Sequence, residues 1–198
     1  MSTKRLLPED ERQRINRIAT DLCYCTDRLD QEAVRDGCSP DSEERSTIHE
    51  SEQTILSPLL DDGFDLVGIG VARCVLQFPV ESSLANYVVK LARFGDDLFS
   101  SGFVQNKREA VLWHRHGISG DWPLLPVPDH HQRRFRWLIM PYGEPLTELP
   151  KEEGRPLLQR ATAELAMFPL NLQELRAENF VVIDDEPFLA DYGRPDGV

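Results

Sequence analysis

The sequence has no apolar run that approaches the roughly 20 residues needed to cross a bilayer as a helix. Its first residues lead into the polar stretch Pro8-Glu9-Asp10-Glu11, at the place where a secretory signal would have its apolar core. These absences predict a cytoplasmic protein with no membrane association. The rest of the composition is that of a folded domain, because 40% of the 198 residues are hydrophobic and a chain of this length buries a sizeable core.

Positive charge is also scarce. Lys and Arg together number 22 against 34 Asp and Glu, which gives a net charge of -12 at pH 7. This balance argues against a general surface for nucleic acid or anionic membranes, although it does not exclude a local basic groove. Only four of the cations are lysines, namely Lys4, Lys90, Lys107 and Lys151. The acidic, arginine-rich composition resembles that of halophilic haloarchaeal proteins or their viruses, and a GC-rich genome would produce the same arginine bias.

Cysteine is rare as well, with four in the chain. Cys23, Cys25, Cys38 and His49 do not follow any of the common zinc-ligand spacings, and two cysteines two positions apart on a helix point to different faces. We therefore expect ordinary buried or partly buried thiols, without disulfides in a reducing cytosol.

The first 62 residues predict two amphipathic helices. Residues 8–30 carry an apolar stripe, and the acidic residues after Pro8 suit the positive end of a helix dipole. A second helix is expected from about residue 41 or 42 to residue 60. These helices either form a layer packed on the rest of the domain or serve as an arm that binds a protein partner.

The middle of the chain changes from a helical period to short runs typical of strands. Two strands joined at a glycine turn are expected over residues 66–79, and a third over residues 87–92. At Gly68 and Gly70 the backbone can offer its amide hydrogens to phosphate groups without side chains in the way. Lys90, at the centre of the third strand, is either a charged residue on an exposed edge or a cation held for a phosphate and a carboxylate.

A helix is expected over residues 105–116, and its Glu109 lies 19 residues after Lys90. A helical glutamate by itself is usually only a solvated charge. The remaining expected elements are strands at residues 122–128 and 135–143, a solvated polar turn between them at 129–134 that contains His130 and His131, and a helix at 152–168.

The last quarter of the chain predicts a hairpin. A polar loop ends at Asn179, an apolar strand follows, an acidic turn reverses the chain, and a second strand ends at Asp191. Because a tight turn brings the two outer ends of a hairpin together, an amide oxygen and a carboxylate can share one hard cation. The pattern therefore indicates a Mg²⁺ site.

This last segment resembles the catalytic loop and metal-binding triplet of the protein-kinase-like superfamily. The family pattern Arg-Asp-Leu-Lys-Pro-Glu-Asn is matched by residues 173–179, and the Asp-Phe-Gly triplet by Asp191-Tyr192-Gly193. The resemblance extends over about residues 63–194. It implies an α+β fold of two lobes, with a five-stranded antiparallel sheet, one crossing helix and a minimal second lobe.

The resemblance also implies three parts, which are a helical extension (1–62), an N-lobe with its hinge (63–143) and a small C-lobe (144–198). It also implies an ATP and Mg²⁺ site. In that site Gly68 and Gly70 cover the phosphates, Lys90 contacts the phosphates and pairs with Glu109, and Asn179 and Asp191 bind Mg²⁺. Met140 is the gatekeeper, Tyr142 and Gly143 meet adenine at the hinge, and Glu174 is the base or orients the acceptor hydroxyl.

The sequence departs from the family pattern in three places. Arg73 stands where the family has a third glycine, Glu174 replaces the catalytic aspartate, and Arg194 to Val198 follow Gly193 where the resemblance implies an activation segment. Phosphoryl transfer from ATP to a protein or small-molecule hydroxyl is the expected activity. The alternatives are a pseudokinase that senses nucleotides or binds proteins through its N-terminal helices, and a structural protein that has kept the fold without the ligand.

Overall fold

A computed structural model describes residues 6–36, 42–70, 72–93, 101–168 and 175–193 of the chain, and it leaves the side chains of residues 26–49 undescribed. The chain is α+β, with a five-stranded antiparallel sheet in the order β1-β2-β3-β5-β4 and a separate three-stranded sheet in the order β6-β7-β8. Within the described ranges, no helix has the length and apolarity that a membrane crossing requires.

The helices and strands follow one another closely along the chain. Two helices, α1 (Glu9–Asp36) and α2 (Ser42–Leu60), come first, and the five-stranded sheet consists of β1 (Asp65–Ile69), β2 (Arg73–Gln77), β3 (Tyr87–Ala92), β4 (Asp129–His130) and β5 (Trp137–Pro141). Between β3 and β4 lie α3 (Gly102–Leu112) and a π-helical turn (Trp113–Gly117). The chain ends with β6 (Glu144–Pro145), α4 (Lys151–Leu165), β7 (Phe180–Ile183) and β8 (Glu186–Leu189).

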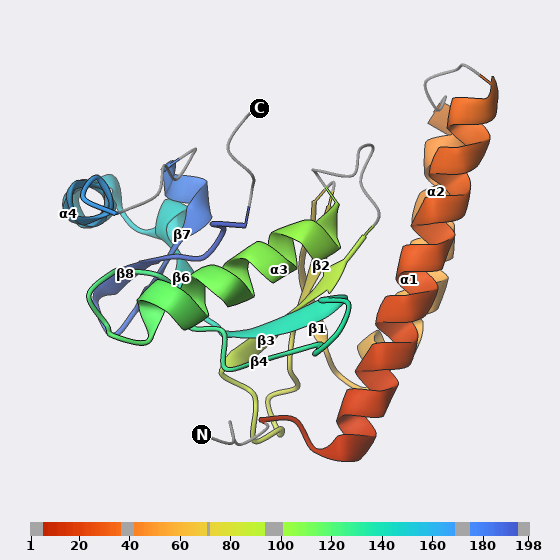
Figure 1. Cartoon of the computed structure of the whole chain (residues 1–198), viewed down its shortest axis with the longest axis horizontal. Helices are drawn as coiled ribbons and strands as arrows, with labels where there is room; N and C mark the ends of the chain where they lie inside the picture. Colours follow the sequence, from red (N-terminus) through yellow and green to blue (C-terminus); the bar gives the residue numbers. More distant parts are fainter. Residues whose placement is uncertain (1–5, 37–41, 71, 94–100, 169–174, 194–198) are drawn as a thin grey trace.

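Strand β3, in the middle of the five-stranded sheet, is buried on both faces, which explains why it is an almost continuous apolar run. Because side chains alternate along a strand, Val89 and Leu91 enter one apolar cluster while Val88 enters the other. Lys90 therefore lies on the same face of the sheet as Val88. Figure 1 shows α1 and α2 side by side at one end of the molecule and α4 at the other.

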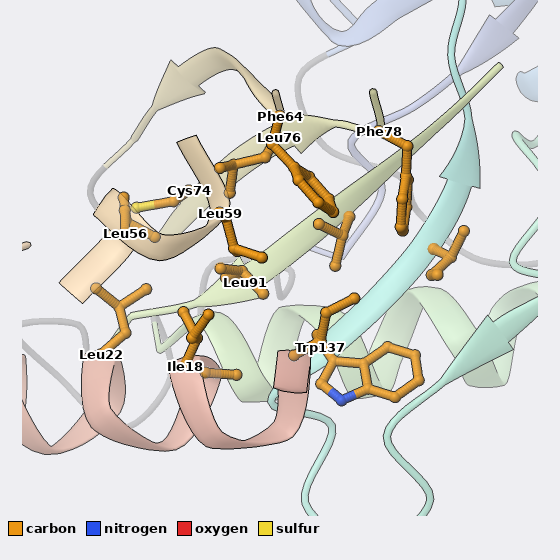
Figure 2. Close-up of a cluster of buried hydrophobic side chains, with 14 of the residues drawn as sticks. Ile18, Leu22, Leu56, Leu59, Phe64, Cys74, Leu76, Phe78, Leu91 and Trp137 are labelled. Atoms are coloured by element: carbon orange, nitrogen blue, oxygen red, sulfur yellow. The ribbon is translucent and has the colours of Figure 1, made fainter. Parts of the chain in front are cut away.

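The first cluster joins the two N-terminal helices to the sheet. In Figure 2, apolar side chains of the helices face those of the strands, and the cluster includes Ile18, Leu22, Leu56, Leu59, Cys74, Leu76, Leu91 and Trp137. Polar contacts fix α1 in the same place, since the indole Nε1 of Trp137 donates to Asn16 Oδ1 at 2.5 Å. The described parts of α1 and α2 thus form a layer on the sheet, and Cys74 lies in the core with a free thiol.

The expected strand at residues 122–128 is wrong. Pro123, Pro126 and Pro128 have no amide hydrogen, and this segment makes only an isolated bridge between Leu124 and Leu189 of β8. The fifth strand of the sheet is instead β4, which falls inside the segment predicted to be a polar turn.

The turn was also expected to be solvated, and at its start it is not. Asp129 is buried and forms an ion pair with Arg12 of α1, with Nη2 2.6 Å from Oδ2, and the Leu7 amide donates to the same oxygen at 3.2 Å. The ring of His130 stacks on Phe135 at a centroid distance of 5.1 Å. The Asp129 carboxylate accepts hydrogen bonds from Leu7 and Arg12, which lie near the other end of the sequence. The polarity of the residues around Asp129 therefore does not predict its burial.

Candidate functional site

A cleft of about 810 Å³ lies between the glycine turn of the large sheet and the hairpin of β7 and β8. Most of the predicted site residues line it, namely Gly68, Gly70, Lys90, Tyr142, Gly143, Asn179 and Asp191. Met140 does not, because its side chain is fully buried in the second apolar cluster. Glu174 lies outside the described residues. The volume is in the range of small-molecule sites, about 300–1,000 Å³.

Lys90 and Glu109 form a buried ion pair across β3 and α3. Lys90 Nζ lies 3.3 Å from Glu109 Oε2 and donates at 2.5 Å to the carbonyl oxygen of Ala190. Because Lys90 is buried, it is not an exposed residue at a sheet edge. Glu109 has no exposed surface, so its charge depends entirely on protein partners.

Glu109 accepts two further hydrogen bonds. Arg73 Nη1 lies 2.7 Å from its Oε1, and the backbone amide of Gly193 donates to the same atom at 3.2 Å. The glutamate of α3 therefore holds β2, β3 and the segment after β8 together. The same segment packs closely on α3, since a Cβ atom at Gly193 would lie only 2.4 Å from the carbonyl oxygen of Gln105.

Arg73 joins the site from a position where the sequence indicated only a missing glycine. Its second nitrogen, Nη2, lies 2.6 Å from Asp191 Oδ1, so the guanidinium bridges Glu109 and Asp191. The register between β2 and β3 explains why Arg73 reaches the site. Val75 pairs with Lys90, and residues two apart share a face, which places Arg73 on the face of Lys90. We call Arg73, Lys90, Glu109 and Asp191 the charged cluster.

The pKa values of Arg73 and Lys90 shift in opposite directions within the charged cluster. Burial lowers the pKa of the Lys90 ammonium, and the nearby Arg73 guanidinium lowers it further, against the opposing effect of Glu109. Burial also works against the charge of Arg73, but the carboxylates of Glu109 and Asp191 outweigh it and raise the pKa of the guanidinium. Arg73 is thus a permanent cation, whereas the charge of Lys90 is more easily lost.

The glycines of the cleft fall into two kinds. A Cβ atom on Gly68 would meet no atom within 4 Å, and one on Gly70 would meet only Arg73 O at 3.7 Å. At Gly143, by contrast, a Cβ would lie 2.9 Å from the side chain of Val181. Packing therefore requires glycine at Gly143, whereas at Gly68 and Gly70 the missing side chain leaves space in the cleft.

The predicted hinge passes along the wall of the cleft. The amide of Tyr142 donates to Asn86 O at 2.8 Å, so this hydrogen is already used within the protein. Pro141 has no amide hydrogen. Of the two amides that the resemblance implied for a ligand, the amide of Tyr142 therefore already has a partner within the protein.

Asn179 and Asp191 lie at the two ends of the hairpin, as the pattern of the last quarter predicted. The carbonyl oxygen of Asn179 accepts from the amide of Ala190 at 2.8 Å, which fixes the entry of the hairpin beside its exit. The Asp191 side chain is 44% exposed despite its contact with Arg73. Mg²⁺ keeps several waters and takes one or two carboxylates together with phosphate oxygens, so these donors fit that ion. Among the described residues, no group of three or more His, Cys, Asp or Glu side chains is placed to hold a metal without a ligand.

No family model matches this chain, and no curated protein matches its sequence.

Proposed function

We propose that the cleft binds ATP together with Mg²⁺, that the chain has a protein-kinase-like fold, and that it transfers a phosphoryl group from ATP to a hydroxyl of a protein or small molecule. The observation that carries this proposal is Lys90, which lines the cleft together with Asp191 and forms an ion pair with the buried Glu109 behind it. A buried ion pair is weak evidence for stability alone. Its position beside a carboxylate and an open glycine turn supports a role in ligand binding.

Seven of the predicted site residues have a defined task in this proposal. Gly68 and Gly70 leave room for phosphates beside the β1–β2 turn, and Lys90 donates to the phosphate oxygens while Glu109 keeps it in place. Asn179 and Asp191 would hold Mg²⁺ through their oxygen atoms, and the ion would supply positive charge for the phosphates when bound. Glu174 is the proposed base or orienting residue for the acceptor hydroxyl.

A second function is favoured by the contact between Arg73 and Asp191. A protein that binds nucleotide without transferring phosphate, a pseudokinase, does not need the metal-binding carboxylate to be available. In this structure Asp191 already has a cationic partner at 2.6 Å. Nucleotide binding is common to both functions, and phosphoryl transfer separates them.

Isothermal titration of ATP, with and without Mg²⁺ and in both low and high salt, tests the shared part. We expect Mg²⁺-dependent binding that Lys90→Met weakens by tenfold or more, since a charged hydrogen bond contributes about 1.5–3 kcal/mol. Lys151→Met, at an exposed lysine of α4, is the matched control and should bind as the wild type does. Absence of heat with millimolar ATP in every buffer would refute both functions.

Transfer of labelled γ-phosphate separates the two. Glu174 is one methylene longer than the aspartate of the family, and a misplacement of about 1 Å can cost on the order of 10²-fold in rate. We expect slow transfer that Glu174→Ala abolishes, with ATP binding retained. Transfer by Glu174→Ala at the wild-type rate would show that Glu174 is not the base. No transfer by wild type, Glu174→Asp or Glu174→Ala, despite measured ATP binding, would favour the pseudokinase.

A further inference from the structure

A second cavity, of about 480 Å³, has no described lining residue in common with the cleft. Its walls come from α1, from α3 and from the turn between β4 and β5. The lining consists of Cys23, Tyr24, Phe103, Val104, Lys107, Arg133, Arg134, Phe135 and Arg136. We call this cavity the basic pocket, because Lys107, Arg133, Arg134 and Arg136 are all cations and none of the lining residues that the structure describes is acidic.

The charge of the basic pocket is opposite to that of the chain, which carries a net charge of -12. None of its four cations forms an ion pair with a carboxylate in the part of the chain that the structure describes. Cations gathered around a concave wall repel one another unless an anion lies between them. The pocket is therefore electrostatically prepared for an anionic ligand.

The pocket also offers flat aromatic surfaces. Arg136 lies over the Tyr24 ring, with its guanidinium carbon 5.8 Å from the ring centroid, and donates a hydrogen bond to the hydroxyl of Thr20. The guanidinium is therefore held against α1 before any ligand enters. Together with Phe103 and Phe135, Tyr24 gives the walls an apolar part on which a ring can pack.

The backbone at Phe135 is strained, and buried contacts maintain the strain. Phe135 has φ of 50°, in the left-handed region that bulky side chains avoid. The side chain of Asn106, which is 0% exposed, donates from Nδ2 to the Phe135 carbonyl at 2.9 Å. In this conformation Phe135 and the arginines on either side of it all line the same cavity. Strain that the surroundings maintain is characteristic of binding sites.

We propose that the basic pocket is a second ligand site, separate from the cleft, for a small aromatic anion in which a phosphate or carboxylate is attached to a planar ring. The anionic group pairs with Arg133, Arg134 and Lys107, and the ring packs among Tyr24, Phe103 and Phe135. A small molecule fits better than a polymer, because the volume of about 480 Å³ is that of a small-molecule cavity.

Titration calorimetry with 2-naphthyl phosphate, 2-naphthoate, 2-naphthol and inorganic phosphate tests the proposal on the full chain. We expect 2-naphthyl phosphate or 2-naphthoate to bind at least tenfold more tightly than both 2-naphthol and inorganic phosphate. The double variant Arg133→Gln/Arg134→Gln should lower that affinity about tenfold or more, because charged hydrogen bonds are lost. Both arginines are exposed, so the fold should persist, which circular dichroism can verify. Arg155→Gln, at an exposed arginine of α4, is the matched control.

Two further variants locate the ligand. Phe135→Leu keeps an apolar side chain but removes the ring, so it should weaken 2-naphthyl phosphate severalfold and leave inorganic phosphate unchanged. Lys90→Met, in the cleft, should change neither. Equal affinity for 2-naphthyl phosphate in the wild type and the double arginine variant would overturn the proposal, as would loss of its binding in Lys90→Met. Failure of ATP to bind the cleft leaves this inference untouched, because the two sites have no described lining residue in common.

Discussion

Arg73 and Asp191 are 118 positions apart in the chain, yet Arg73 Nη2 lies 2.6 Å from Asp191 Oδ1. The same guanidinium contacts Glu109 at 2.7 Å. The carboxylate that the proposed function assigns to Mg²⁺ therefore already pairs with a cation of the protein. Any divalent ion at Asp191 has to share this oxygen with Arg73 or displace the guanidinium.

The first prediction is that Arg73→Gln increases the affinity of the nucleotide-free protein for a divalent ion. The Arg73 guanidinium repels a divalent ion at Asp191, and the substitution removes this repulsion. We expect the affinity to rise by about three- to tenfold and no more, because the 44% exposed carboxylate is partly screened by solvent. Mn²⁺ binding followed by electron paramagnetic resonance measures the change. Arg73→Gln/Asp191→Asn is the control and should lose the gain. Equal affinities in wild type and Arg73→Gln would show that Arg73 does not restrict the site.

The second prediction concerns the stability contributed by Glu109. Glu109→Gln leaves the buried cations of Arg73 and Lys90 without the charge that compensates them, and we expect the free energy of unfolding to fall by about 3–5 kcal/mol. Asp191→Asn, at the exposed end of the same cluster, should cost about 1 kcal/mol or less. Urea unfolding of the three proteins measures both values. Equal losses in the two variants would contradict the central role of Glu109.

The third prediction contrasts two glycines of the site. Gly68→Ala should leave the free energy of unfolding within about 0.5 kcal/mol of the wild type, because its Cβ meets no atom within 4 Å. Gly193→Ala should destabilise by about 1–3 kcal/mol, because its Cβ would lie 2.4 Å from a backbone oxygen of α3. Under the proposed function, Gly68→Ala also weakens ATP binding although the fold is intact. Thermal unfolding together with ATP titration checks both effects, and a strongly destabilised Gly68→Ala would show that the fold itself needs this glycine.

Much of the coarse fold was predictable because its signals are local. Apolar period predicted both N-terminal helices, strands β1 to β3, the helix of Glu109 and the hairpin of β7 and β8. The resemblance to the protein-kinase-like superfamily implied that Lys90 and Glu109 would pair, and Lys90 Nζ lies 3.3 Å from Glu109 Oε2. The proline-rich segment 122–128 misled the prediction, because its apolar residues pack on β8 without adding a strand to the large sheet.

The contacts that the sequence did not predict are formed between residues that are distant along the chain. Asp129 was predicted to be a solvated turn residue, whereas in the structure it pairs with Arg12, which is 117 positions away in the chain. At position 73 the sequence indicated only that the third glycine of the family pattern is missing. The pattern does not predict which residues the arginine side chain contacts instead. The strand register showed that its side chain shares a face with Lys90, but only the fold brings Asp191 within reach.

The last prediction is a pH dependence that Lys90 imposes on stability. Burial, reinforced by Arg73, lowers the pKa of Lys90 below its ordinary value of 10.5. Between the lowered pKa and about 10.5, the unfolded chain binds more protons at this residue than the folded chain does, so the contribution of Lys90 to stability rises with pH in that window. Buried Cys74 acts in the opposite direction, since burial raises its thiol pKa to about 12. The difference in unfolding free energy between wild type and Lys90→Met cancels this background. Measured by urea unfolding from neutral pH to just above 10.5, the difference should shift in favour of the wild type as pH rises. A difference that does not change with pH would show that Lys90 keeps its ordinary pKa in the folded protein.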